Sequence, residues 1–167
     1  VQPFPNMTVL ENVSAGALFA AGAKNIRESR EQAMEHLEFV GLADEAEKSA
    51  TALPLAGRKR LELAKSLAMK PRLLMLDEVN AGLNSTEIDG ALKLIQAISD
   101  RGITLILIEH LMKVVMSMSS RIVVLHHGKL IANGTPAEVI KDQSVIEAYL
   151  GRRFAEKMAK EKNGQMT

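Results

Sequence analysis

Apolar residues recur at helical spacing through the first seventy positions of the chain. A capping-box pattern, Thr-x-x-Glu, opens an Ala-rich stretch, which predicts a helix over residues 8–21. A second helix is predicted over residues 27–40, where Gly41 supplies a stop, and a third over residues 57–69. Residues 1–70 are therefore predicted to be almost wholly helical.

The pattern then changes to unbroken apolar runs, at residues 73–76, 104–108 and 122–125. Runs without alternation are typical of strands buried on both faces. A helix capped by Asn84 or Ser85 is predicted between the first two runs. The order strand, helix, strand predicts a parallel sheet.

The end of the chain adds shorter elements. Residues 129–132 are predicted to form a hairpin with the preceding strand, and residues 135–138 hold a further capping box with Pro at the first helical position. A basic tail follows, predicted to be a solvated or frayed helix. We therefore expect a helical part over 1–70, an α/β part over 71–150 and a tail over 151–167.

Composition narrows the class of protein. The 167 residues are 47% apolar and 25% charged, which supports a packed core and excludes a disordered or collagen-like chain. Lys plus Arg is 21 against 20 Asp plus Glu, so the net charge of +1 gives no footprint for nucleic acid. The absence of cysteine excludes disulfides and thiolate metal sites, and the apolar runs are too short to span a membrane. The start at Val1, without Met or a signal-peptide pattern, is interpreted as a cut.

Acidic and histidine side chains follow two of the apolar runs. Asp77 and Glu78 come at the carboxyl end of the first, where ligands bind in open α/β sheets. Asp77 could hold Mg²⁺ through water, while Glu78, pointing the other way along the pleat, could polarise an attacking water; the alternative is that acids simply end the strand. His110 follows the next run and is expected at the same edge, where it could donate to a phosphate oxygen or be an ordinary surface histidine.

Several ordered motifs resemble a known family. Gln2 with residues 3–13 (Pro-Phe-Pro-Asn-Met-Thr-Val-Leu-Glu-Asn-Val) resembles the Q-loop and first subdomain helix of ATP-binding cassette (ABC) transporter ATPases. A Walker B run with its glutamate at 73–78, a D-loop at 81–84 (Ala-Gly-Leu-Asn) and an H-loop at His110 follow in the family's order. The resemblance covers all but the tail. It implies a P-loop NTPase-type α/β fold with a helical subdomain and a partial, mostly parallel sheet flanked by helices.

The resemblance also implies roles for single residues. In the family two cassettes face head to tail, and each ATP lies between the phosphate-binding loop of one and the signature motif of the other. By motif match, Gln2 would sense Mg²⁺ and the attacking water and relay to the transmembrane partner, and Asp77 would hold Mg²⁺. Glu78 would be the general base, and His110 would hold the γ-phosphate and the water. Asn84 would lie in the D-loop at the dimer interface, where many relatives carry Asp.

The signature departs from the family's LSGGQ. It falls on Leu53-Pro54-Leu55-Ala56-Gly57, where only Leu53 is unchanged. Pro54 removes a hydroxyl and an N–H donor, and Ala56 adds a methyl where glycine lets backbone approach phosphate. Three basic residues follow, either as compensating charge or as a solvated first turn. Whether this segment supports hydrolysis, or only slow or asymmetric hydrolysis, stays open.

No G-x-x-x-x-G-K-[ST] motif occurs in the chain. In the family this phosphate-binding loop precedes the Q-loop, so the chain reads as the C-terminal part of an ATPase that would not bind Mg-ATP tightly alone. Without the strands that complete the family's core, we expect exposed apolar surface and a tendency to associate.

The substrate class rests on two further segments. The D-loop and residues 145–151 (Val-Ile-Glu-Ala-Tyr-Leu-Gly) are similar to cassettes of the branched-chain amino acid uptake group, although the latter could be ordinary packing of a last helix. The group implies ATP-driven import, with a second ATPase subunit in a homo- or heterodimer, transmembrane permease subunits and an extracytoplasmic solute-binding protein. It also implies a peripheral position on the cytoplasmic face of the membrane.

Two rival functions remain at this point. A soluble ABC protein acting on ribosomes or DNA should carry basic patches, and the charge of +1 argues against it. A non-catalytic truncated cassette could act as an interaction module, although such a module would not need Glu78 or His110. The transported solute and the partner subunits are not encoded in these patterns.

Overall fold

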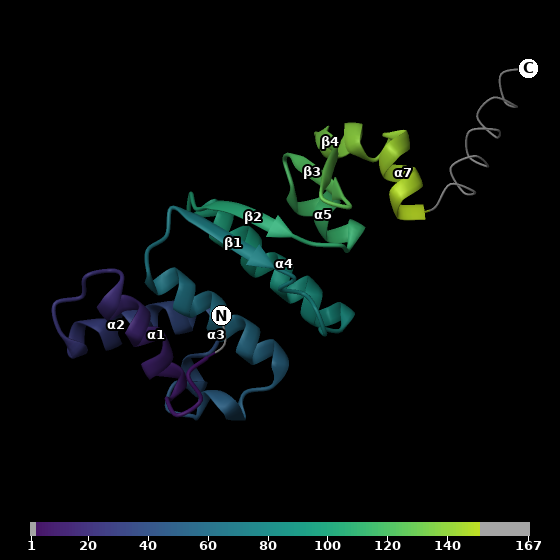
Figure 1. The fold of residues 1–167 in the computed structure, drawn as a ribbon. Helices are drawn as coiled ribbons and strands as arrows, with labels where there is room; N and C mark the ends of the chain where they lie inside the picture. The colour runs from purple at the N-terminus through teal and green to yellow at the C-terminus, as the bar shows by residue number, and fades with distance from the viewer. Residues whose placement is uncertain (1–2, 151–167) are drawn as a thin grey trace, which may run out of the picture. The chain divides into compact units, whose positions relative to one another are not determined.

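The computed structural model describes residues 3–150 and contains two compact units that divide between Ile108 and Glu109 (Figure 1). The basic tail and Gln2 lie outside the described residues. The first unit contains α1 (Val9–Phe19), α2 (Ile26–Val40), two 3₁₀ turns (Ala43–Glu45 and Ala50–Ala52), α3 (Leu55–Ala68), β1 (Leu73–Asp77), α4 (Ser85–Asp100) and β2 (Thr104–Ile108).

In the helical part of the first unit, capping residues mark where α1 begins and where α2 begins and ends. Thr8 and Glu11 form the expected capping box of α1, and Asn25 caps α2 by accepting from the amide of Glu28. Gly41 ends α2 with φ of 72°, a left-handed backbone that glycine adopts without steric cost. The predicted helical character of this region is confirmed.

The three helices share one apolar core. Val9 and Val13 of α1, Ala33 and Leu37 of α2 and Leu61 of α3 are fully buried in it. Burial of each valine or leucine side chain contributes about 1.5–3 kcal/mol relative to exposure. This core therefore holds α3, and with it the signature segment, against α1 and α2.

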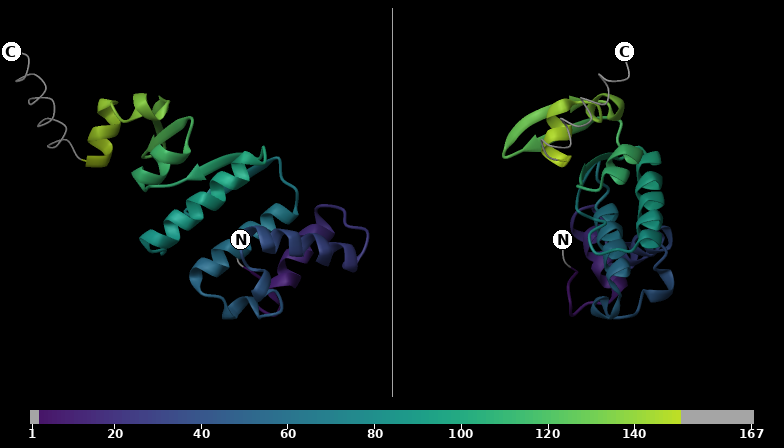
Figure 2. Two further views of the ribbon diagram at one scale, coloured as in Figure 1. Left: turned by 180° about the vertical axis from the view of Figure 1, so that it is seen from behind. Right: turned by 90° about the vertical axis from the view of Figure 1, so that its right-hand side faces the viewer.

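The remaining part of the first unit is a strand-helix-strand element. β1 and β2 pair in parallel, in register from Leu73 with Thr104 to Asp77 with Ile108, as the sequence predicts. Helix α4 joins them and runs alongside the two strands (Figure 2). Its apolar stripe includes Ile95, which is fully buried.

The expectation that these strands are buried on both faces is wrong for the described part of the chain. Leu74 and Leu76 are buried, but Leu73 and Met75 on the other face are 48% and 62% exposed. Ile106 of β2 is 43% exposed. Successive residues of a strand point to opposite faces, and within residues 3–150 only one face of this pair is well covered. The apolar composition of the open face marks it as a surface built for burial.

The second unit is built around a β-hairpin. Its elements are α5 (Met112–Met118), β3 (Ile122–His126), β4 (Lys129–Gly134), α6 (Pro136–Val139) and α7 (Gln143–Leu150). β3 and β4 pair antiparallel, as expected, through a turn in which His127 and Gly128 take φ of 47° and 73°. The prediction that residues 122–125 are buried on both faces is wrong here too, since Val123 and Leu125 are 57% and 68% exposed.

Candidate functional site

The carboxyl end of β1 carries the two acidic residues that the sequence singles out. Asp77 ends the strand in register with Ile108, and its exposed side chain continues the alternation of Leu73 and Met75 on the open face. Glu78, also exposed, has a left-handed backbone with φ of 46°, and its amide donates to the carbonyl of Ile108 at 3.0 Å. The expectation that Glu78 continues the pleat is therefore wrong, because the chain turns at this residue.

The D-loop connects this strand end to α4. Two successive hydrogen bonds of the i to i+3 type, at 3.0 and 3.2 Å, turn the chain within residues 78–83. Gly82 takes φ of 80° in this turn. Asn84 then begins α4 in a capping box with Glu87, with both hydrogen bonds between 2.9 and 3.0 Å. Asn84 thus has a structural role at the start of the helix.

The signature segment forms the N-terminal end of α3. Leu53 is 4% exposed and belongs to the helical core, while Pro54 is the N-cap residue and makes no side-chain capping hydrogen bond within the described chain. The helix begins at Leu55, two residues earlier than predicted. Gly57 is buried, and a Cβ there would lie 3.3 Å from the Cβ of Leu53. The absence of a Cβ at Gly57 therefore lets the first turn of α3 pack closely against Leu53.

The signature and the D-loop of the same unit touch each other. The Cδ2 atom of Leu55 lies 2.8 Å from the position that a Cβ would take at Gly82, closer than real Cβ contacts come. Only a residue without a Cβ fits opposite Leu55 as the side chain stands. Leu55 is nevertheless 40% exposed, so its outer part also faces solvent.

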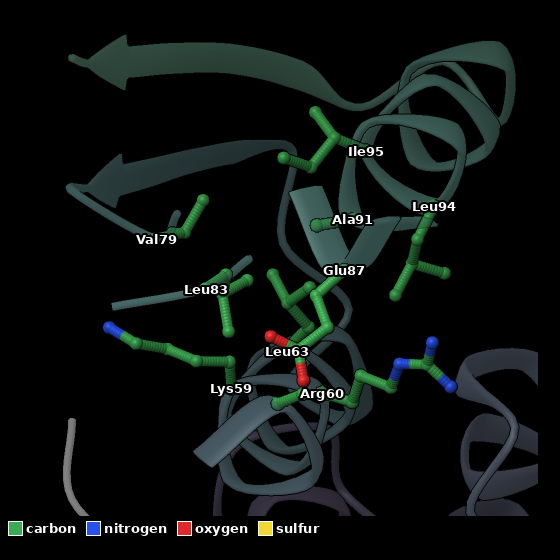
Figure 3. Close-up of a pocket in the computed structure, with 10 residues that line it drawn as sticks. Lys59, Arg60, Leu63, Val79, Leu83, Glu87, Ala91, Leu94 and Ile95 are labelled. Atoms are coloured by element: carbon green, nitrogen blue, oxygen red, sulfur yellow. The ribbon is translucent and has the colours of Figure 1, made fainter. Parts of the chain in front are cut away.

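A crevice between α3 and α4 continues this contact (Figure 3). In Figure 3 the carboxylate of Glu87 points toward α3, and the side chains of Lys59 and Arg60 extend to either side of it. The Arg60 guanidinium also approaches two glycines, lying 3.5 Å from the Cβ position of Gly41 and 3.6 Å from that of Gly90. Arg60 therefore packs between helices and does more than form part of a solvated first turn. The lining residues are Ala56, Lys59, Arg60, Leu63, Val79, Leu83, Glu87, Ala91, Leu94 and Ile95.

The loop that follows Gln2 is fixed to two helices. The amide of Phe4 donates to Oδ1 of Asn12 at 2.7 Å, and Nδ2 of this fully buried asparagine donates back to the Phe4 carbonyl at 3.1 Å. The Lys65 ammonium of α3 lies 3.7 Å from the centre of the Phe4 ring. Partial burial lowers the pKa of Lys65, with Glu62 opposing the shift. The predicted Q-loop thus leads into a segment tied to the signature helix.

His110 belongs to the second unit, whereas Asp77, Glu78, the D-loop and the signature belong to the first. The structure therefore brings the residues of the first unit together, while His110 is described within the second unit and Gln2 lies outside the described residues. The backbone carbonyl of His110 accepts a hydrogen bond from the Tyr149 hydroxyl at 3.0 Å.

The donor set at the strand end suits magnesium but not a metal held by protein alone. Within residues 3–150, no group of three or more His, Asp or Glu side chains is arranged to hold an ion. Mg²⁺ usually keeps several waters and takes one or two carboxylates together with substrate phosphates. A single exposed carboxylate at the end of β1, that of Asp77, fits this mode of binding.

The sequence reasoning missed the interactions that support these motifs. Asn12 stands between apolar positions of α1, and a polar residue on a buried face is a signal for a hydrogen-bonded anchor. The contact of Leu55 with Gly82 and the hydrogen bond of Tyr149 to His110 join residues far apart in the chain. No local pattern could have indicated them.

Two family models match the chain. A model described as ABC transporter matches residues 1–81, and one described as branched-chain amino acid ATP-binding cassette transporter matches residues 129–155. No helix within residues 3–150 has the length and apolar character needed to cross a bilayer.

The descriptions of similar proteins agree with these family models. The chain is 40% identical to the high-affinity branched-chain amino acid transport ATP-binding protein BraF of Pseudomonas aeruginosa and 37% identical to LivG, of the same description, from Escherichia coli. Each alignment covers 90% of this chain and 65% of the relative, so the chain spans just under two thirds of their length. It is 33% identical to the methionine import ATP-binding protein MetN 1 of Oceanobacillus iheyensis, covering 95% of this chain and 48% of the relative.

Solved structures share the fold. The ADP conformation of MJ1267, an ATP-binding cassette of an ABC transporter, matches with a TM-score of 0.74 and 25% identity over 89% of this chain and 64% of that one. The structure of cbiO1 from Clostridium perfringens, part of the ABC transporter complex cbiONQ, matches with a TM-score of 0.75 and 28% identity over 95% and 63%. The motifs, the fold and these relatives together show that the chain belongs to the family of ABC transporter ATP-binding cassettes.

Proposed function

We propose that this chain is the signature, Walker B and H-loop part of a cassette that hydrolyses ATP to drive import of branched-chain or related amino acids. The observation that carries the proposal is the close arrangement, in one unit, of Asp77 and Glu78 at a strand end with the D-loop and the signature helix. The transport of branched-chain amino acids named for BraF and LivG supports the substrate class.

ATP hydrolysis also needs a phosphate-binding loop, which residues 1–167 do not contain. The proposal therefore concerns the intact cassette, by which we mean these residues together with such a loop. The open apolar face of β1 and β2 supports this, because such a face is normally covered by a further layer of secondary structure. The isolated chain is expected to bind Mg-ATP weakly and to associate.

In the intact cassette the residues at the end of β1 divide the chemistry. Asp77 would hold Mg²⁺, which when bound neutralises phosphate charge. The oxygen of the attacking water would bond to the terminal phosphorus while the bond from that phosphorus to the leaving ADP oxygen breaks. The carboxylate of Glu78 would accept the proton that the water loses. His110 would hold the terminal phosphate and the water, and Gln2 would contact both the metal and the water.

The signature segment would act on the nucleotide of a second ATPase subunit. The start of α3 presents backbone N–H groups and the positive end of the helix dipole, both of which attract phosphate. Pro54 contributes no N–H, and Leu55 and Ala56 replace glycines of the usual motif. We therefore expect slower turnover than an unaltered LSGGQ would support. Asn84 would lie at the interface between the two subunits.

The partners follow from the family. The cassette would pair with a like or unlike second ATPase subunit, dock on permease subunits at the cytoplasmic face of the membrane, and serve an extracytoplasmic solute-binding protein indirectly. The net charge of +1 supports a function without nucleic acid.

Glu78→Gln in the intact cassette tests the catalytic proposal. The amide keeps the shape of the side chain but cannot accept the proton, so steady-state phosphate release should fall at least a hundredfold while ATP binding remains. Glu31→Gln is the matched control, because it breaks only an exposed ion pair with Arg27 and should leave turnover unchanged. Undiminished turnover in Glu78→Gln would refute the assigned role of Glu78. ATP binding without hydrolysis in the unaltered cassette would favour a non-catalytic module.

A further inference from the structure

The last helix of the second unit reaches back to the H-loop. The hydroxyl of Tyr149, near the end of α7, donates to the backbone carbonyl of His110 at 3.0 Å, although 39 positions separate the two residues. Both lie within the same compact unit. Tyr149 also lies within residues 129–155, which the branched-chain amino acid cassette model matches. The motif that contains it is otherwise unused by the proposed function.

The segment that carries His110 lacks a side-chain cap of its own. Helix α5 begins at Met112, and its N-cap residue, Leu111, makes no side-chain capping hydrogen bond within the described chain. In the first turn, the Leu111 carbonyl accepts hydrogen bonds from the amides of Val114 and Val115 at 2.9 and 3.1 Å. The Tyr149 hydroxyl supplies a hydrogen bond directly before this turn. It therefore restrains the backbone from which the His110 side chain projects.

Helix α7, which carries Tyr149, is held in place by packing and by a cap. Val145 is buried with Ile122 and Val139 in the core of the second unit. Asp142 caps the helix by accepting from the amide of Ser144 at 2.8 Å. A tyrosine has only two side-chain torsions, so placing its hydroxyl costs little conformational entropy.

We propose that Tyr149 is a positioning residue, which orients His110 for the terminal phosphate by holding the backbone carbonyl of that histidine. This inference rests on the proposed function of the chain. The alternative, packing of an apolar ring, is disfavoured because Tyr149 is 57% exposed. The hydroxyl of Tyr149 is the group that has a specific partner, the carbonyl of His110.

Tyr149→Phe in the intact cassette removes the hydroxyl and keeps the ring. We expect kcat for ATP hydrolysis to fall about three- to tenfold, the range that one net hydrogen bond supports. The KM for ATP should stay within about twofold, because His110 is expected to matter more in the transition state than in nucleotide binding. Amide hydrogen exchange in a peptide covering residues 109–114 should become faster, with exchange in α4 unchanged.

Gln143→Ala is the matched control. It removes an exposed hydrogen bond on α7, from Gln143 Nε2 to Glu147 at 3.2 Å, and does not touch the H-loop. The control should leave both kcat and the exchange of residues 109–114 unchanged. An equal loss in the control would mean that α7 acts only through its general stability and would overturn the inference.

The remaining outcomes separate the inference from the proposed function. Unchanged kcat in Tyr149→Phe, whether or not exchange becomes faster, would overturn the positioning role while the activity of the unaltered cassette upholds the proposed function. If the unaltered cassette does not hydrolyse ATP, the proposed function fails. The positioning role then fails with it, and the exchange measurement still reports whether the hydrogen bond orders the H-loop backbone.

Discussion

The contact between the signature and the D-loop predicts the cost of a single methyl group at Gly82. In Gly82→Ala the new Cβ would lie 2.8 Å from Cδ2 of Leu55, and the residue would have to keep φ of 80°. The left-handed backbone costs an L-residue about 1–2 kcal/mol. Moving the half-exposed Leu55 side chain off its rotamer costs about 1 kcal/mol more. Together these terms predict a loss of about 2–3 kcal/mol in the free energy of unfolding.

Gly102 offers a matched control for the backbone term. It has nearly the same φ, 81°, but no heavy atom of the described chain lies within 4 Å of its Cβ position. Gly102→Ala should therefore cost only about 1–2 kcal/mol. In a Leu55→Ala background the methyl at position 82 meets no side chain, so the cost of Gly82→Ala should fall to that of the control. The difference, about 1 kcal/mol, is the coupling energy of the pair.

Urea unfolding of the intact cassette, followed by circular dichroism, measures these values from the shift in midpoint at constant slope. The double-mutant cycle needs Gly82→Ala, Leu55→Ala and the double variant, with Gly102→Ala alongside. If Gly82→Ala costs no more than Gly102→Ala, or if Leu55→Ala leaves its cost unchanged, the contact does not couple the two segments and the reasoning is refuted.

Three further predictions concern the signature, the pH dependence and the loop after Gln2. Pro54→Ser combined with Ala56→Gly should raise kcat severalfold in the intact cassette, because it restores a hydroxyl, an N–H donor and close backbone approach; unchanged kcat would show that these substitutions do not limit turnover. Burial, helped by a nearby arginine and lysine, lowers the pKa of His36 from 6.5. The unfolded chain therefore binds the proton more readily, and the free energy of unfolding should fall as the pH drops below about 6.5. Urea unfolding at pH 7.5 and 5.5 should show a smaller pH dependence in His36→Gln. Asn12→Asp should lower the free energy of unfolding by about 2–4 kcal/mol, because it replaces a buried donor to backbone carbonyls, whereas Asn25→Asp at an exposed cap should cost almost nothing; equal midpoint shifts in the two variants would contradict this.

The sequence predicts the helices well because their signals are local. A capping box needs two residues three positions apart, and the one predicted at Thr8 forms; of the two caps considered for the later helix, Asn84 is the N-cap residue. The stop at Gly41 depends on one residue that adopts a left-handed backbone. The parallel pairing of β1 with β2 follows from the helix between them, since a parallel connection requires a crossover.

The surroundings of the strands could not be predicted in the same way. An apolar run states that both faces suit burial, but it does not state what covers them. Leu73 and Met75 are exposed although the apolar run to which they belong is typical of a buried strand. The left-handed backbone of Glu78 depends equally on context, because glutamate has no local preference for that conformation.

The signature shows why motif comparison and structure lead to different expectations. Compared with LSGGQ, Leu55 is a loss, because a bulky side chain replaces a glycine that would allow close approach to phosphate. In the structure the same side chain contacts the D-loop at Gly82, a residue that lacks a Cβ and adopts a left-handed backbone. A Cβ at position 82 would require the Leu55 side chain to move from this position. We therefore expect Leu55 to change the signature in two ways: it should weaken phosphate binding there, and it contacts the D-loop of the same chain. Pro54→Ser with Ala56→Gly leaves Leu55 and its contact with Gly82 in place, so turnover in that variant reports only what the other two substitutions cost.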